Sequence, residues 1–241
     1  LRRGNLFFGS NNSLSLFIGF NIQSQTSKDH VHGNPQNASP STERNKFVVF
    51  CCFCRLYAWM GTIMAILSMS LLPVETISDL SSAYFIGVLK TASPLLLIHI
   101  FGVGINELYD VEIDKINKPY LPLASGEIST EVGIVIVAIS AILSIGIGLT
   151  SGSLPLLCSI LTYFFLGIAY SADLPFLRWK KSSFLATASI TFVRIFAAQL
   201  AIFIHFQINV FRKPMMFTKS IIFATVFMFI YMPGVALFKV H

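Results

Sequence analysis

Long apolar segments alternate with short polar connections over most of this 241-residue chain, and this alternation limits the folds open to it. Each segment is close to the ~20 residues that an α-helix needs to cross a bilayer. We therefore predict an all-α fold, a polytopic transmembrane helical bundle of about six spans. The first span is short unless it includes the apolar stretch that begins at Phe47. The expected spans lie at about 57–73, 83–105, 131–150, 154–172, 183–206 and 217–238.

The composition supports a membrane protein. Hydrophobic residues make up 54% of the chain and charged residues 12%, with a mean hydropathy of +0.73, whereas charged residues are about a quarter of a soluble domain. A β-barrel would show short alternating segments, and these apolar runs are continuous. The net charge of +6 does not indicate a nucleic-acid partner, because the basic residues gather at the ends of the apolar segments, as they do in membrane proteins.

The connections give a topology. Six spans place the loops 106–130 and 173–182 on one face of the membrane, and both loops carry basic residues. The connections 74–82 and 150–154 lie on the opposite face and contain no Lys or Arg, which fits the positive-inside rule. The connection 207–219 contains three basic residues on that same opposite face and departs from the rule.

Residues 1–45 differ from the rest of the chain. They contain seven Ser and seven Asn but only two acidic residues. A serine-rich, basic and acid-poor segment is typical of an organelle transit peptide, and a merely disordered tail fits the same composition. We predict two parts: a disordered, transit-peptide-like segment 1–45 and a transmembrane domain 46–241.

Acidic residues gather in one stretch, NELYDVEIDKINKPYLPLASGEIS, which begins at Asn106. Asn106, Asp110 and Asp114 recur every four residues, so on a helix they share one face. Carboxylate and amide oxygens are the ligands that Mg²⁺ prefers, and the spacing predicts a magnesium site. The alternative is that the charges only solvate a loop, which is what we expect of Glu107 and Glu112.

This stretch resembles the first aspartate-rich motif of the UbiA-type membrane prenyltransferases. The phrase NKPYLPLASGE is similar to the plant plastid branch, which includes homogentisate phytyltransferases and flavonoid prenyltransferases. The resemblance runs from roughly Arg55 to Lys239. It implies a nine-helix fold in the plastid (chloroplast) membrane, in contact with lipid. The implied reaction transfers a phytyl or dimethylallyl group from a prenyl diphosphate to an aromatic acceptor, such as homogentisate or a flavonoid or other phenol, with Mg²⁺.

The resemblance also assigns residues to that reaction. Carboxylates repel a diphosphate but can hold Mg²⁺ that bridges to it, which gives Asp110 and Asp114 a catalytic role through the metal. A second segment, YSADLPFLRWKK at 170–181, resembles the family's basic segment between two later helices. Diphosphate contacts are therefore implied for Tyr170, Arg178 and Lys180. An ordinary interfacial belt is the alternative for this segment, and Lys118 is a further candidate for a phosphate contact.

Arg194 stands apart from these motifs. It lies near the middle of the expected span 183–206, where an unpaired charge costs roughly 2.5 kcal/mol or more. We expect either a salt bridge inside the bundle or a polar cavity near the diphosphate, in which Arg194 contributes to substrate binding. His99 lies two turns before Asn106 and shares its face; we expect it to be buried and satisfied by a neighbour.

The chain reads ALFKVH from Ala236, where the family continues with ALFKD and a second aspartate-rich motif. We therefore expect a C-terminally truncated family member with half of the metal ligands. Two interpretations stay open: an aromatic prenyltransferase, and a non-catalytic member that binds metal or prenyl diphosphate in the membrane. A small transporter with Arg194 on its permeation path is a third.

Overall fold

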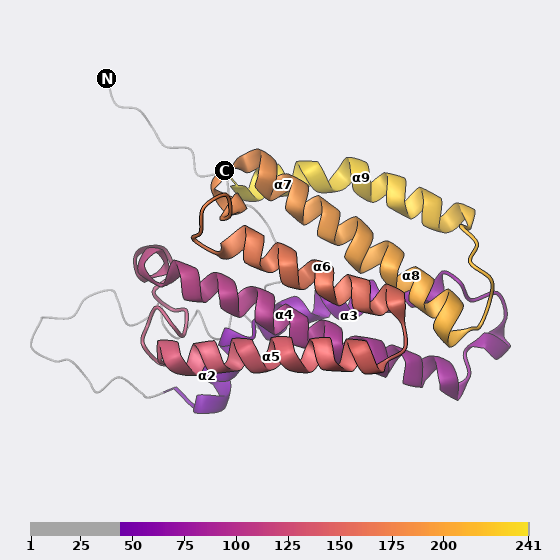
Figure 1. Ribbon diagram of the computed structural model, residues 1–241, viewed down its shortest axis with the longest axis horizontal. Coiled ribbons are helices and arrows are strands. Elements are labelled where there is room, and N and C mark those ends of the chain that lie inside the picture. Colours follow the sequence, from indigo (N-terminus) through magenta and orange to yellow (C-terminus); the bar gives the residue numbers. More distant parts are fainter. Residues whose placement is uncertain (1–43, 241) are drawn as a thin grey trace, which may run out of the picture. The chain divides into compact units, whose positions relative to one another are not determined.

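The computed structural model describes residues 44–240, and the regular structure among them is entirely helical (Figure 1). The expected all-α fold is confirmed. Residues from Asn45 onward form one compact unit. The transit-peptide interpretation of residues 1–45 falls almost wholly outside the described residues.

The bundle begins with a bent pair, α2 (Lys46–Phe53) and α3 (Leu56–Leu71), whose axes differ by 50°. Asn45 caps α2, its side chain accepting a hydrogen bond from the Phe47 amide at 2.9 Å. Arg55 lies at the break with φ 48° and ψ 54°, a left-handed conformation that ends α2 and turns the chain. The expected recruitment of residues from Phe47 therefore occurs across a bend and not in one straight helix.

The long helix α4 (Ser82–Asn117) has 36 residues and contains Pro94. Proline lacks the N–H that would bond the carbonyl four residues earlier, and that carbonyl, of Lys90, instead accepts from the Ser93 hydroxyl at 3.3 Å. The Pro94 carbonyl accepts from Ser144 Oγ at 2.8 Å. With both carbonyls satisfied, α4 runs through the proline and past the expected end of its span.

Two helices, α5 (Thr130–Thr150) and α6 (Leu154–Ser171), lie against α4 (Figure 1). Small residues allow the close approach: a Cβ on Gly104 would collide with Val137 of α5 and press on Phe53. Close packing over small residues is the usual basis of helix association in membranes.

The next long helix changes its hydrogen-bonding period along its length, with two π-helical stretches between α-helical ones. Its parts are α7 (Ser183–Phe192), η3 (Val193–Leu200), α8 (Ala201–His205) and η4 (Phe206–Val210). Ser159 Oγ of α6 donates to the Ala197 carbonyl inside η3 at 2.8 Å. The final helix, α9 (Lys219–Val240), packs beside α7 and η3 (Figure 1).

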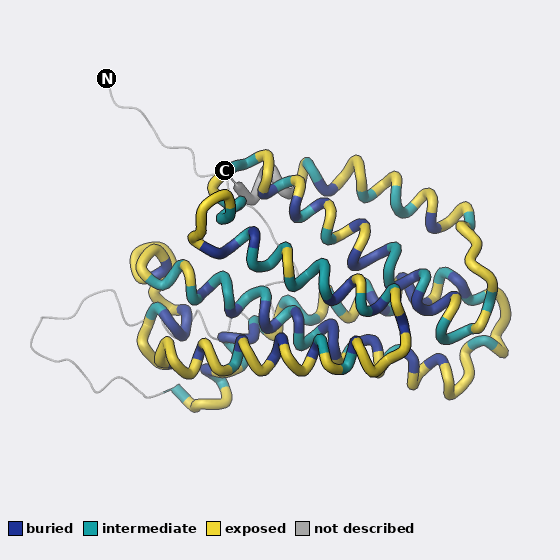
Figure 2. Tube along the Cα trace, viewed as in Figure 1, coloured by how far each residue is buried: buried dark blue, intermediate teal, exposed yellow. Residues whose placement is uncertain are grey.

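The described helices correspond to the expected spans. Four of them are long and apolar enough to cross a membrane, and the bent α2–α3 pair makes five. The sixth expected span coincides with α9, whose residues 219–234 form a shorter apolar helix. The outward faces of the helices remain apolar and exposed, as along α5 and α9 in Figure 2, which fits contact with lipid.

A polar cluster joins the two connections opposite the acidic loop, and we call it the clasp. Lys213 Nζ lies 3.0 Å from Asp79 Oδ2, 3.5 Å from Glu75 Oε2 and 3.3 Å from the Pro73 carbonyl. Asp79 ends the short helix η1 (Ile77–Asp79). One of the three basic residues in the discordant connection is thus paired locally with acids. The departure from the positive-inside rule stays, because acidic residues contribute little to that rule.

Candidate functional site

The last turns of α4 carry the residues that we call the acidic row: Asn106, Asp110 and Asp114. They lie on one continuous helix, as the four-residue spacing requires. The Asp110 side chain is 14% exposed and the Asp114 side chain 4%. Both carboxylates are thus largely buried, and a buried charge needs a partner.

Basic residues from the connection after α6 supply that partner. Lys180 lies in the short helix η2 (Trp179–Lys181). Its Nζ donates to Asp110 Oδ2 at 2.6 Å and to Asn106 Oδ1 at 3.1 Å. Arg178 donates to Asp110 Oδ1 at 3.4 Å and pairs with Asp173 at 2.6 Å. Two loops on one predicted face therefore meet at Asp110, as the topology required.

The surroundings of Lys180 disfavour its charged form. Burial lowers the pKa of Lys180 below its usual 10.5, although the hydrogen bond to Asp110 opposes that shift. Arg178, 11% exposed in its side chain, adds a like charge nearby. A further anion beside Lys180 would relieve this partly desolvated cation.

Each of the other acidic residues near the end of α4 pairs with a basic residue. Asp114 pairs with Lys118 at 3.3 Å on the same helix. Glu112 pairs with Lys115 and is 82% exposed, as expected for loop solvation. Glu107 does not behave as expected: its side chain is 1% exposed and lies 3.4 Å from Arg55 NH2. The prediction for Glu107 is wrong because a cation at the α2–α3 break draws it into the bundle.

Several polar atoms around the row are buried without a hydrogen-bond partner among the described residues. They are Asp114 Oδ2, Glu107 Oε2, Arg178 Nε and Arg55 Nε. Buried polar groups are almost always paired, so these atoms have hydrogen-bonding capacity that water or a ligand can fill. Both signs of charge are represented among the unpaired atoms.

The acidic row fits a divalent cation in the chemistry of its donors. Its oxygens are hard ligands, and Asp114 Oδ2 is buried and unpaired. No group of three or more Asp, Glu, His or Cys side chains in residues 44–240 could hold a metal. Mg²⁺ commonly binds through one or two carboxylates and completes its shell with water and substrate phosphates, so this donor set suits a metal shared with a ligand.

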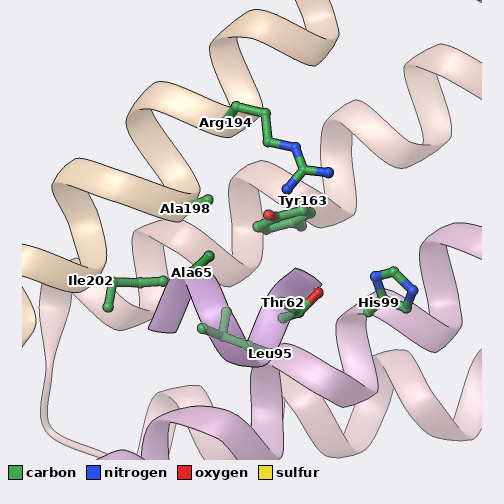
Figure 3. A pocket seen from close by; sticks show the side chains of 8 residues that line it. All are labelled: Thr62, Ala65, Leu95, His99, Tyr163, Arg194, Ala198 and Ile202. Atoms are coloured by element: carbon green, nitrogen blue, oxygen red, sulfur yellow. The ribbon is translucent and has the colours of Figure 1, made fainter. Parts of the chain in front are cut away.

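The other predicted site residues lie in two places, one near Asp110 and one in a separate cavity. Tyr170 is on the last turn of α6, close enough to Asp110 for an electrostatic interaction. Arg194 lies in η3 and lines a separate cavity with His99 and Tyr163 (Figure 3). No contact between Arg194 and the acidic row is found among the described residues, and its predicted place near a diphosphate stays a prediction. His99 was expected to be satisfied, but its Nε2 is buried and unpaired.

Sequence reasoning missed the supporting residues. Ser171 Oγ lies 3.5 Å from Asn106 Oδ1, and Asp173 anchors Arg178. Both lie inside the segment YSADLPFLRWKK, so its chain position beside the basic residues was the available signal. The pairing of Glu107 with Arg55 joins positions 52 residues apart, and no local pattern reports it.

This arrangement defines a class of protein. An apolar helical bundle ends in a half-buried cluster of oxygens and cations, which can bind the anionic head of a molecule whose apolar part lies among the helices.

Comparison with known proteins agrees with that class. Residues 58–241 match the UbiA prenyltransferase family, and the chain belongs to this family. It is 48% identical to homogentisate geranylgeranyltransferase of Hordeum vulgare over 78% of this chain and 46% of that protein. It is 41% identical to homogentisate phytyltransferase 1, chloroplastic, of Arabidopsis thaliana, over 98% of this chain and 61% of that protein.

A relative with a different acceptor in its name is similarly close. Naringenin 8-dimethylallyltransferase 2, chloroplastic, of Sophora flavescens is 43% identical over 79% of this chain and 47% of that protein. The chain spans about half the length of the curated relatives it matches. No solved structure matches the chain.

Proposed function

We propose that this chain is, or is part of, an aromatic prenyltransferase of the plastid membrane. It would transfer a prenyl group from a prenyl diphosphate to an aromatic acceptor. Membership of the UbiA family supports the reaction class, and the word chloroplastic in the names of two relatives supports the compartment. Four or five apolar helices support a multi-pass placement in lipid.

The observation that carries the proposal is the position of Lys180. Its ammonium group bridges Asn106 and Asp110 while Arg178 reaches the same carboxylate. Asp110 is contacted by two cations, of which Arg178 also pairs with Asp173, and unpaired polar atoms lie around them. Two partly buried cations that converge on one point suit a ligand with several negative charges, such as a diphosphate.

We assign the acidic row to Mg²⁺. Asn106, Asp110 and Asp114 would hold the ion, which supplies charge neutralisation for the diphosphate oxygens. Lys118 is half exposed beside Asp114 and is assigned a phosphate contact, as is Tyr170 next to Ser171. The residues of the row would then orient the head, and the tail would lie along the apolar faces of α4 and α6.

The proposed reaction breaks the bond between the first prenyl carbon and the diphosphate oxygen, whose electron pair leaves with the diphosphate. Lys180 and Arg178 stabilise the charge that develops on this leaving group. A carbon of the electron-rich acceptor ring forms the new carbon–carbon bond, and the ring then loses a proton. Exclusion of water by the surrounding helices protects the allylic cation from hydrolysis.

Binding of a prenyl diphosphate, with and without Mg²⁺, tests this function on the chain in detergent or nanodiscs. Asp110→Asn removes a carboxylate from the row and should lower the Mg²⁺-dependent affinity at least about tenfold, as expected for loss of a charge-assisted contact. Glu112→Gln is the matched control, because it makes the same chemical change on an exposed side chain of the same helix.

The two variants give a clear decision. Equal affinities for wild type and Asp110→Asn would show that the acidic row is not the diphosphate site. Loss of affinity in Asp110→Asn alone supports the site. Prenylated product formed from an aromatic acceptor, in the same preparation, then distinguishes an enzyme from a family member that only binds.

A further inference from the structure

Positive charge gathers on one connection that the proposed function does not use. The connection 211–218 and the first residue of α9, Lys219, contain three basic residues at the end of the bundle where α4 begins (Figure 1). Lys213 is held by the acids of the clasp. Arg212 and Lys219 are exposed and form no ion pair with a residue in 44–240. The described part of the chain therefore leaves two cations of this connection uncompensated.

The connection is held in a defined conformation. The buried Gln207 side chain donates to the Met216 carbonyl at 3.1 Å and accepts from the Met216 amide at 3.2 Å. The Lys213 amide donates to the Gln207 carbonyl at 2.9 Å. Between these fixed points Arg212 has φ 57°, a left-handed conformation that is uncommon for a residue other than glycine. The loop thus presents its outward side chains in a constant arrangement.

The outward side chains of the connection are apolar as well as basic. Met215, Met216 and Phe217 are exposed, and Arg212 and Lys219 flank them in the chain. The helix before them has 28 residues and is roughly 40 Å long, close to the ~40–45 Å of a bilayer with its headgroups. The connection therefore lies at headgroup level, where apolar side chains contact acyl chains and long basic side chains reach lipid headgroups.

We propose that this connection binds the headgroup of an anionic phospholipid, on the membrane surface opposite the acidic row. Arg212 and Lys219 pair with the lipid phosphate, and Met215 and Phe217 lie against the upper part of its acyl chains. The three basic residues exceed the two acids of the clasp, so the charge of this surface is complementary to an anion. Such a lipid compensates the basic residues that depart from the positive-inside rule.

Titration of the detergent-solubilised chain with short-chain phosphatidylglycerol, and with phosphatidylcholine of the same chain length, tests this site. We expect phosphatidylglycerol to bind at least about tenfold more tightly, because it alone carries a net negative charge. Arg212→Gln and Lys219→Gln should each weaken phosphatidylglycerol about fivefold, and the double variant roughly 30-fold. Phosphatidylcholine affinity should not change.

Two further variants separate the site from effects on folding and on overall charge. Arg212→Gly also removes the charge, and glycine suits the left-handed backbone, so its loss of phosphatidylglycerol affinity should match that of Arg212→Gln without a loss of stability. Lys46→Gln is the control, because it removes a charge from an exposed lysine of α2, outside this connection. It should leave the affinity for phosphatidylglycerol unchanged.

Four results would overturn the proposal. They are equal affinities of the two lipids for wild type, an equal loss of phosphatidylglycerol affinity in Lys46→Gln and Arg212→Gln, displacement of the lipid by inorganic phosphate at the same concentration, and a loss of prenyl diphosphate affinity in the double variant. The third would show a site for free anions, and the fourth would place the connection at the diphosphate site. Asp110→Asn should leave phosphatidylglycerol affinity unchanged, so this proposal and the proposed function can fail separately.

Discussion

The acidic row and the clasp are built from the same residue types at opposite ends of the bundle, yet they leave their charges in different states. In the clasp, Asp79 accepts hydrogen bonds from the backbone amides of Glu75 and Thr76 and from Lys213. Those backbone bonds, with Lys213, lower the pKa of Asp79 from 3.8 to about 2, and Asp79 in turn raises the pKa of Lys213.

At the acidic row, burial disfavours the charged form of the lysine and some polar atoms have no partner. Burial lowers the pKa of Lys180, and polar atoms of Asp114 and Arg178 have no partner among the described residues. An ion cluster whose hydrogen bonds are complete stabilises the fold, whereas an incomplete, desolvated one has capacity for a ligand. This difference supports the proposal that the clasp stabilises the fold and that the acidic row binds the ligand.

Replacing the lysine in each cluster tests the comparison most strongly. Lys180→Met should lower prenyl diphosphate affinity by about 10- to 100-fold, because it removes a partly buried cation that contacts the anion. Lys213→Met should leave that affinity unchanged and lower the unfolding temperature instead. Both are measured by titration and thermal unfolding in the same detergent; an equal loss of affinity in the two variants would remove the distinction.

Alkaline pH should affect only the acidic row. Lys180 binds an anion in its protonated form, and burial holds its folded pKa below 10.5, so diphosphate affinity falls as pH rises through that pKa. The decline should be up to about tenfold per pH unit. Lys180→Arg keeps its charge and should show no such decline. An alkaline decline that persists in Lys180→Arg would come from another group.

The clasp should respond at acid pH. Because the folded pKa of Asp79 lies below its unfolded value, its contribution to stability is present above about pH 4 and is lost as pH falls toward 2. Asp79→Asn should therefore lower the unfolding temperature by a few degrees at pH 7, and by progressively less toward pH 2. A difference that is the same at both pH values would mean that the charge of Asp79 does not matter.

The smallest effect is expected midway between the two clusters. Ser144→Ala removes the hydrogen bond to the Pro94 carbonyl and should cost about 0.5–1 kcal/mol of stability. Diphosphate affinity should not change, because neither cluster contacts Ser144. A shift in affinity would show that the proline region of α4 transmits strain to the acidic row.

The features that depend on local periodicity and composition, namely the helices and the residues that share a helix face, could be predicted from the sequence. Apolar segment lengths predicted the helices, and a four-residue spacing placed Asn106 and Asp110 on one face, where both contact Lys180. Contacts between distant segments were not predictable in this way. The burial of Glu107 depends on Arg55, and the cavity at Arg194 depends on side chains from α3, α4 and α6. Such arrangements follow from packing, which a single sequence does not report.

The unbroken course of α4 has a consequence for how this chain can vary. Its 36 residues extend about 54 Å, well beyond the roughly 30 Å hydrocarbon layer. Between Pro94 and Asn106 the helix works as a fixed spacer, and one inserted residue would advance the row by about 1.5 Å and rotate it by about 100°. The oxygens would then turn away from Lys180. The number of residues in this stretch is therefore under stricter constraint than their identity.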